Sequence, residues 1–165
     1  GADLSLVDPD NRRPVDWDAR RTALDDLAPL LDDPNVGAVQ DLFDAPTPRA
    51  YLYLTARLLR WRRRNPTLAA AEGYVDLTPE GEGAEDWLAF GRFMGPEDDP
   101  DASLLTVVAR HPLTRDPDAP TTLPLPDVLT GRAWTDVLTG GSVEADGALD
   151  VQALPTDRGA VLAAE

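Results

Sequence analysis

A segment near the N-terminus concentrates side chains that can bind a polar ligand. It contains Asp8, Asp10, Asn11, Arg12 and Arg13, with prolines at positions 9 and 14, just before a predicted helix. Carboxylates accept hydrogen bonds, guanidinium groups donate them in pairs, and an amide does both. The prolines restrict the backbone, so these groups would be preorganised. This density of hydrogen-bonding groups suits a polyhydroxylated ligand.

This segment suggests two other interpretations. It can be a capping and salt-bridge turn that ties a loop to the next helix, and this alternative stays open. Alternation of Asp8, Asp10 and Arg12 also has the spacing of a calcium loop, but that interpretation fails. Arg13 stands where such a loop needs glycine, and Ala19 stands where it needs glutamate.

Composition excludes several classes of function. The 165 residues include 30 acidic ones and carry a net charge of −15, which repels phosphate, so we expect neither nucleic acid nor an anionic membrane as partner. There is no cysteine and His111 is the single histidine, so we expect no metal and no cofactor. No apolar stretch approaches the roughly 20 residues that span a bilayer. Without a leader-like N-terminus, the expected location is cytoplasmic.

The first half of the chain has helical patterns. Asp16 is a predicted N-cap, and Leu24, Leu27 and Leu31 share one helical face. Pro29 is expected to kink or end this helix. Residues 36–46 remain ambiguous, although a short helix fits them.

The strongest helical pattern covers residues 48–64. Thr47 is the expected cap, with Pro48 at the first helical position. The predicted apolar stripe consists of Tyr51, Leu54, Leu58 and Trp61. The arginines of residues 57–64 suggest either an anion site or, as we prefer, a helix surface that pairs with an acidic protein.

After Gly73 the pattern changes to short runs of strand-forming residues separated by turns. These runs are residues 73–77, 86–93, 103–110, 121–125, 132–138, 149–154 and 159–163. The run at 104–109 is the predicted central strand. We therefore expect an α+β chain, with a helical segment in residues 1–70 and an antiparallel β-sandwich in residues 71–165.

Three stretches resemble maltooligosyltrehalose synthases of the α-amylase superfamily of glycoside hydrolases. Residues 5–16 read S-L-V-D-P-D-N-R-R-P-V-D, which is similar to the segment after the last barrel strand of that family. Residues 53–63 resemble the helix before its C-terminal β-domain. Residues 123–126 and 134–140 resemble the closing hairpin of that domain. The order and spacing of all three agree with a C-terminal part of such an enzyme.

The resemblance implies a fold and a chemistry. The family converts the reducing-end α-1,4 bond of a maltooligosaccharide into an α,α-1,1 bond by intramolecular transglucosylation, with two carboxyl groups flanking the bond. Those groups lie on earlier strands of a (β/α)8 barrel, which takes about 250 residues, so this chain is too short to hold it. We expect no catalytic residue here, and no catalysis by this chain alone.

The resemblance also implies partners. Residues 1–70 would then be the end of the barrel, and the remainder of the barrel would be the main partner. Asp8, Asp10, Asn11, Arg12 and Arg13 would line the cleft that binds the maltooligosaccharide in the intact enzyme.

Two functions of other classes compete with a supporting fragment. One is a free-standing, non-catalytic glucan-binding β-sandwich module, and the other is an acidic interaction domain unrelated to sugars. Aromatic side chains that stack on sugar rings would favour the glucan-binding module. Trp61 and Trp87 are expected in the core, whereas Trp134 follows a turn and is the candidate for glucan contact.

Overall fold

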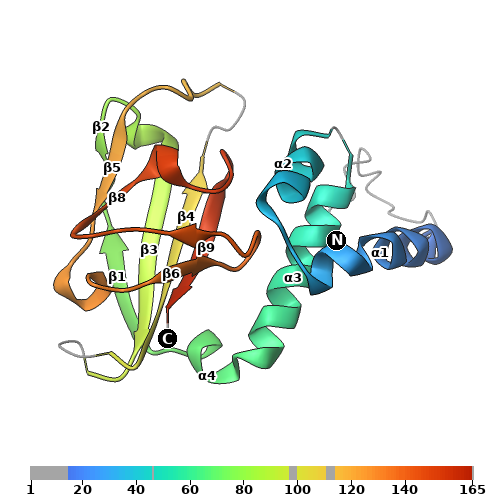
Figure 1. Cartoon of the computed structure of the whole chain (residues 1–165), viewed down its shortest axis with the longest axis horizontal. Coiled ribbons are helices and arrows are strands. Elements are labelled where there is room, and N and C mark those ends of the chain that lie inside the picture. The colour runs from blue at the N-terminus through green and yellow to red at the C-terminus, as the bar shows by residue number, and fades with distance from the viewer. Residues whose placement is uncertain (1–14, 46, 97–99, 111–113, 165) are drawn as a thin grey trace, which may run out of the picture.

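The computed structural model describes residues 15–45, 47–96, 100–110 and 114–164. Four helices come first in this part of the chain: α1 (Trp17–Asp32), α2 (Val36–Asp44), α3 (Arg49–Arg64) and the short α4 (Pro66–Ala69). Strands follow them, so the predicted α+β class is confirmed (Figure 1). Among the described residues, no helix combines the length and the hydropathy needed to cross a membrane.

Helix α1 begins where the sequence predicts it and continues further than expected. Asp16 is the N-cap, and its carboxylate accepts a hydrogen bond of 2.9 Å from the amide of Ala19. Pro29 does not end the helix, because α1 runs to Asp32 with the proline inside it, and the kink that was the other expectation stays a prediction. Leu31 is fully buried beyond the proline, so tertiary packing holds the last turn in place.

Helix α3 turns a different face to the protein than its apolar stripe predicts. The buried residue is Tyr53, while Tyr51 of the predicted stripe is 49% exposed. Tyr53 packs with Leu27, Leu31 and Val39 of α1 and α2 in a small helical cluster. Pro48 occupies the N-cap position, and no side chain caps this helix, so the expected cap by Thr47 is not formed.

Two antiparallel sheets make up the second half of the described chain. Sheet A has the strand order β1-β3-β4-β9-β6-β7, and sheet B has the order β2-β5-β8. The strands of sheet A are β1 (Gly73–Leu77), β3 (Trp87–Met94), β4 (Ala102–Ala109), β9 (Gly159–Ala164), β6 (Trp134–Asp136) and β7 (Ser142–Val143). The strands of sheet B are β2 (Glu80–Gly81), β5 (Thr121–Pro124) and β8 (Ala148–Asp150).

The core lies between the two sheets, as in a β-sandwich. Alternate residues of β4 and β9, such as Leu105 and Leu162, point inward and meet Leu123 and Leu149 of sheet B. Strand β4 pairs with β3 on one side and with β9 on the other, which confirms the central strand predicted at residues 104–109. Strands β2 and β7 are short strands that the sequence did not predict, because only turns were expected in these two segments.

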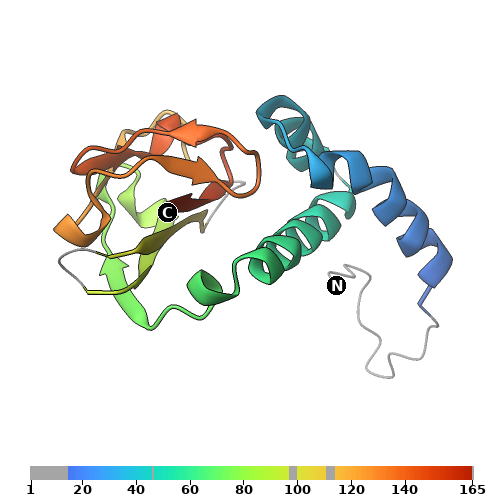
Figure 2. The same ribbon diagram turned by 60° about the horizontal axis from the view of Figure 1, so that its bottom comes forward.

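The helices and the strands meet at one side of the sandwich. In both views, α3 leads from the helical pair α1 and α2 down to α4, next to the sandwich (Figures 1 and 2). The division into units 1–70 and 71–165 stays a prediction, but the change from helix to strand falls between α4 and β1.

Candidate functional site

The five predicted ligand-binding residues, Asp8, Asp10, Asn11, Arg12 and Arg13, lie outside the described residues. Of the sequence motif that contains them, the structure describes Val15 and Asp16. His111 also lies outside the described residues. The chemistry that the structure does describe centres on a buried acid in the strand region.

Asp136, at the end of β6, is fully buried. Its carboxylate accepts four hydrogen bonds, all from the surrounding backbone and one threonine. The amides of Leu138, Thr139 and Val161 donate at 3.3, 3.1 and 3.1 Å, and the hydroxyl of Thr139 donates at 2.7 Å. Burial nevertheless raises the pKa of Asp136 above its usual value of 3.8, because desolvation outweighs these four bonds, which act to lower it.

The hydrogen bonds of Asp136 fix the turn that follows it. The turn closes where the amide of Gly140 donates to the carbonyl of Asp136 at 2.8 Å. Gly140 has a φ of 73°, a left-handed conformation that glycine adopts without strain. Residues 136–141 therefore form a rigid turn, and we call this segment the Asp136 turn.

The Asp136 turn is where the helices attach to the strands. The hydroxyl of Tyr53 donates to the carbonyl of Leu138 at 2.6 Å, and Nε of Arg57 donates to the carbonyl of Val137 at 2.8 Å. Arg57 also donates from Nη1 to the carbonyl of Leu31 at 3.0 Å. One arginine thus joins α1, α3 and the turn. Burial raises the pKa of Tyr53 to about 12, so its hydroxyl stays protonated and can donate.

These contacts make Asp136 a structural acid. Among the residues that the structure describes, it is the one carboxylic acid that is buried. Retaining glycoside hydrolysis uses two carboxyl groups at about 5 Å from each other, and Asp136 faces amides and a hydroxyl instead. In the same described ranges, no three potential ligands gather to hold a metal ion.

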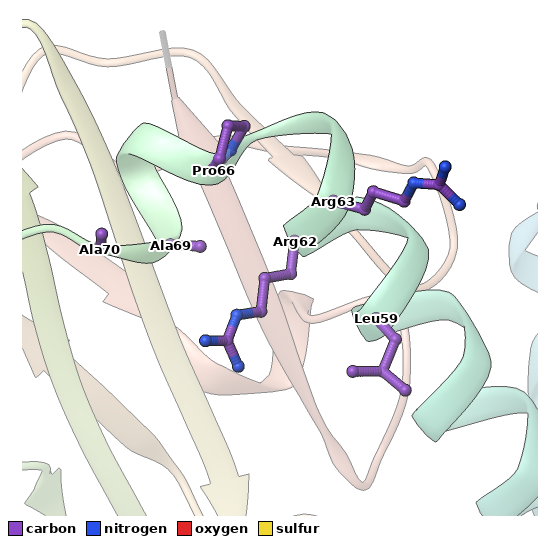
Figure 3. A pocket seen from close by; sticks show the side chains of 6 residues that line it. All are labelled: Leu59, Arg62, Arg63, Pro66, Ala69 and Ala70. Atoms are coloured by element: carbon purple, nitrogen blue, oxygen red, sulfur yellow. The ribbon is translucent and has the colours of Figure 1, made fainter.

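A shallow groove lies along the end of α3 and α4, with a volume of about 420 Å³. It is lined by Leu59, Arg62, Arg63, Pro66, Ala69 and Ala70. The two arginine side chains point in different directions, and neither carboxylate nor nucleophile lines the groove (Figure 3). The groove therefore offers an apolar floor with a cationic rim and no group for catalysis.

The arginine run of α3 is only partly used within the protein. Arg57 binds backbone carbonyls, and Arg60 forms an ion pair of 2.8 Å with Asp32. The next three arginines, at positions 62–64, are exposed. The prediction of a surface that pairs with acidic groups of this protein thus holds for Arg60, whereas Arg57 binds carbonyl groups instead.

The tryptophan prediction that bears on sugar binding is wrong. Trp134 is 1% exposed and packs in the sandwich core, so it cannot stack on a glucan. Although a turn precedes Trp134, the residue begins strand β6, and its side chain points inward between the two sheets. Trp87 is buried as expected, whereas Trp61 is half-buried. The exposed tryptophan is Trp17, at the start of α1.

Comparisons with known proteins point in one direction. No family model matches the chain. The putative maltooligosyl trehalose synthase of Mycobacterium tuberculosis (strain CDC 1551 / Oshkosh) is 34% identical over 140 residues, which cover 84% of this chain and 14% of that protein. Its counterpart in strain ATCC 25618 / H37Rv gives the same values.

A solved structure agrees with the sequence relatives. Maltooligosyltrehalose synthase from Arthrobacter ramosus matches with a TM-score of 0.64 and 29% identity, over 99% of this chain and 19% of that one. A mutant of the same protein gives a TM-score of 0.63. The resemblance predicted from the sequence, to a C-terminal part of maltooligosyltrehalose synthase, is confirmed. The chain spans about one fifth of the solved relative and less of the curated ones.

Proposed function

We propose that this chain is the C-terminal part of a maltooligosyltrehalose synthase and supports a catalytic region that lies elsewhere in a longer protein. One observation carries the proposal: nearly the whole chain matches a fifth of the Arthrobacter ramosus enzyme in structure. The reaction would convert the reducing-end α-1,4 bond of a maltooligosaccharide into an α,α-1,1 bond.

The architecture supports a non-catalytic role. A (β/α)8 barrel alternates parallel strands with helices and places its active site at the carboxyl ends of the strands. The described strands are antiparallel and follow the helices. Without the barrel, the described residues provide no frame on which two catalytic carboxyl groups could flank a glycosidic bond.

The N-terminal motif would be the contribution of this chain to the cleft. In the longer protein, Asp8, Asp10 and Asn11 would accept hydrogen bonds from sugar hydroxyls. Arg12 and Arg13 would donate to sugar oxygens or hold a neighbouring carboxylate in place. Residues 1–70 would complete the barrel, and residues 71–165 would form the C-terminal β-domain.

The experiment compares the full-length protein encoded by the same gene with the 165-residue chain. Both are incubated with maltohexaose, and chromatography follows the loss of reducing ends and the appearance of a trehalose-terminated product. We expect conversion by the full-length protein and none by the 165 residues. Conversion by the short chain, or none by the full-length protein, would overturn the proposal.

The role of the N-terminal motif has its own test in the full-length protein. We expect Arg12→Ala and Asp10→Asn to raise KM for maltohexaose about tenfold, because a lost charged hydrogen bond weakens binding by roughly that factor. Arg21→Ala is the matched control, since its side chain on α1 is 74% exposed and belongs to neither the motif nor the grooves. Unchanged kinetics in both motif variants would remove this segment from the substrate site.

The alternative of a free-standing glucan-binding module has weaker support. Its predicted contact, Trp134, is in the core. The exposed rings of Trp17, Tyr51 and Tyr74 belong to three separate elements, α1, α3 and β1. Calorimetric titration of the 165-residue chain with maltoheptaose distinguishes the two functions. Saturable binding would favour the module, whereas no heat of binding agrees with the supporting fragment.

A further inference from the structure

The outer face of sheet A carries side chains that the sandwich core does not use. Strand register places Leu88 opposite Val108, and Phe90 opposite Thr106, on this face. Tyr74 stacks on Phe90 across β1 and β3, with ring centroids 5.8 Å apart. Tyr74, Leu88 and Val108 are 57%, 50% and 43% exposed. These three large apolar side chains are therefore exposed on the same side of one sheet.

This face is poor in charge although the protein is rich in it. Register extends it through Leu104, opposite Arg92, and Val161, opposite Thr106. Its acidic group in the paired strands is Asp76, which already accepts a hydrogen bond of 2.8 Å from the hydroxyl of Tyr74. Arg92 is likewise engaged, because it donates to the carbonyl of Ala71. The chain has 30 acidic residues, and nearly all of them lie elsewhere than on this face.

Sheet B shows what a water-facing surface looks like in the same protein. Its outward positions are exposed and include Glu80, Thr122 and Asp150. Antiparallel sheets that face water normally alternate in this way, with apolar residues inward and polar residues outward. Sheet A departs from that pattern over its central strands, so its outer face is built to be covered.

The apolar surface continues past the end of sheet A onto α4. Met94 and Ala102, a register pair at the end of β3 and β4, line a second groove of about 380 Å³ with Pro66 and Leu68, and the charged Arg64 and Asp101 lie at the same groove. Pro66 also lines the groove of Figure 3, beside the exposed Leu59. The sheet and the end of α3 therefore belong to one continuous surface.

We infer that the outer face of sheet A, extended by the grooves at α4, is a docking surface for a region of the same longer protein that lies outside these 165 residues. The inference rests on the proposed function. More than four fifths of the solved relative has no counterpart in this chain, so an occupant of sufficient size exists there. On the sheet itself, an apolar surface whose charged groups are already hydrogen-bonded is typical of the buried centre of a protein interface, and the exposed arginines at the α4 grooves would lie at its polar rim.

Protein rather than sugar is the occupant that this surface fits. Glucan platforms present several exposed aromatic rings, whereas here Tyr74 is the exposed ring and the others on the face are aliphatic or half-buried. A second copy of the chain is the competing occupant, and the experiment separates it from the first.

The test uses the absence of cysteine from the 165 residues. Leu88→Cys and Val108→Cys place a thiol on the outer face of sheet A. Thr122→Cys places a matched control on the outer face of sheet B, in strand β5, where the side chain is exposed. Each variant is made in the 165-residue chain and in the full-length protein, and mass spectrometry follows maleimide labelling at the introduced site. Circular dichroism checks that each variant folds.

We expect all three thiols to react quickly in the 165-residue chain. In the full-length protein, the thiols introduced at positions 88 and 108 should react at least tenfold more slowly, and that at position 122 at an unchanged rate. Equal rates at 88 and 108 in both proteins would overturn the inference. If labelling at these two positions in the 165-residue chain becomes slower as the protein concentration rises, the occupant is a second copy of the chain. That result would also overturn the inference.

Maltohexaose conversion, measured on the same full-length samples, keeps the two proposals apart. An active full-length protein with fully reactive thiols refutes the docking surface and leaves the proposed function standing. An inactive full-length protein with protected thiols would refute the proposed function and leave the docking surface standing.

Discussion

The helical region (residues 17–69) and the strand region (residues 73–164) are stabilised in different ways. Four buried residues form the helical cluster: Leu27, Leu31, Val39 and Tyr53. The strand region buries a far larger cluster between its two sheets, including Trp134, Leu105 and Leu162. Stability follows buried apolar area, so the strand region has the means to fold by itself, and the helical region depends on additional contacts.

Those additional contacts are hydrogen bonds to backbone carbonyls of the strand region. Tyr53 and Arg57 donate to the Asp136 turn, and Gln40 donates to the carbonyl of Pro155 at 2.9 Å. A neutral bond of this kind is worth about 1 kcal/mol and the bond from the Arg57 guanidinium about 1.5 to 3 kcal/mol, so the junction adds only a few kcal/mol to the two cores. The comparison indicates that the rigid Asp136 turn of the strand region sets the position of the helical region.

The largest expected effect is in the sandwich core. Trp134→Ala should lower the free energy of unfolding by about 3 to 5 kcal/mol, because it leaves a cavity between the sheets. Urea denaturation followed by circular dichroism measures it. Trp17→Ala is the control, since that side chain is 68% exposed and its removal should cost under about 0.5 kcal/mol. Equal effects of the two variants would contradict the assignment of the core.

Removal of the acid in the Asp136 turn should rank second. Asp136→Ala leaves two buried amides, one partly buried amide and a buried hydroxyl without their acceptor, and we expect a loss of roughly 2 to 3 kcal/mol. Hydrogen exchange should show that α3 amides lose protection together with the turn. If α3 kept full protection, the turn would not position the helices.

A smaller effect is expected at the junction itself. Tyr53→Phe removes the hydrogen bond to the carbonyl of Leu138 and should cost about 1 kcal/mol. Because the bond joins the two regions, the loss of hydrogen-exchange protection should be larger in α1 and α3 than in β4. Tyr51→Phe, on the exposed side of the same helix, should change neither region. A loss confined to β4 would reverse this interpretation.

The free energy of unfolding should depend on pH in part through the protonation of Asp136. Its pKa in the folded state lies above 3.8, so the folded protein binds this proton more tightly than the unfolded chain does. The contribution of Asp136 to the free energy of unfolding should therefore fall as pH rises from 3.8 through the folded-state pKa. Subtracting the pH profile of Asp136→Asn from that of the wild type isolates this slope. A slope of the opposite sign would mean that the hydrogen bonds outweigh burial.

The smallest expected effect concerns the outer face of sheet A, which neither core uses. Leu88→Gln should change the stability of the 165-residue chain by under about 0.5 kcal/mol, since the side chain is half-exposed and no core depends on it. Thermal unfolding measures this. A loss of 2 kcal/mol would assign Leu88 to the sandwich core and remove the contrast between the two faces.

Local signals in the sequence predicted most of the elements. Asp16 caps α1, and the strand expected at residues 73–77 is β1 with the same bounds. These features depend on residues a few positions apart, and the sequence displays such residues directly. The antiparallel sandwich followed from short strands separated by turns. The ligand-binding motif at residues 8–13 stays a prediction, because it lies outside the described residues.

Other features depended on contacts between distant segments. Pro29 breaks a helix in isolation, yet burial of Leu31 keeps α1 intact beyond it. Helix α3 has apolar residues on more than one side, so its own sequence could not tell whether Tyr51 or Tyr53 would face the protein. The Asp136 turn settled that choice from 85 residues further along the chain.

The sequence by itself thus determined most of the elements, their order and the family resemblance, because capping, periodicity and motif spacing are properties of neighbouring residues. Only the tertiary structure decided which apolar residues are buried. In β4 the run from Leu104 to Val108 alternates between a covered and an uncovered face. Both faces are apolar in sequence, and the difference arises because sheet B packs against one of them alone.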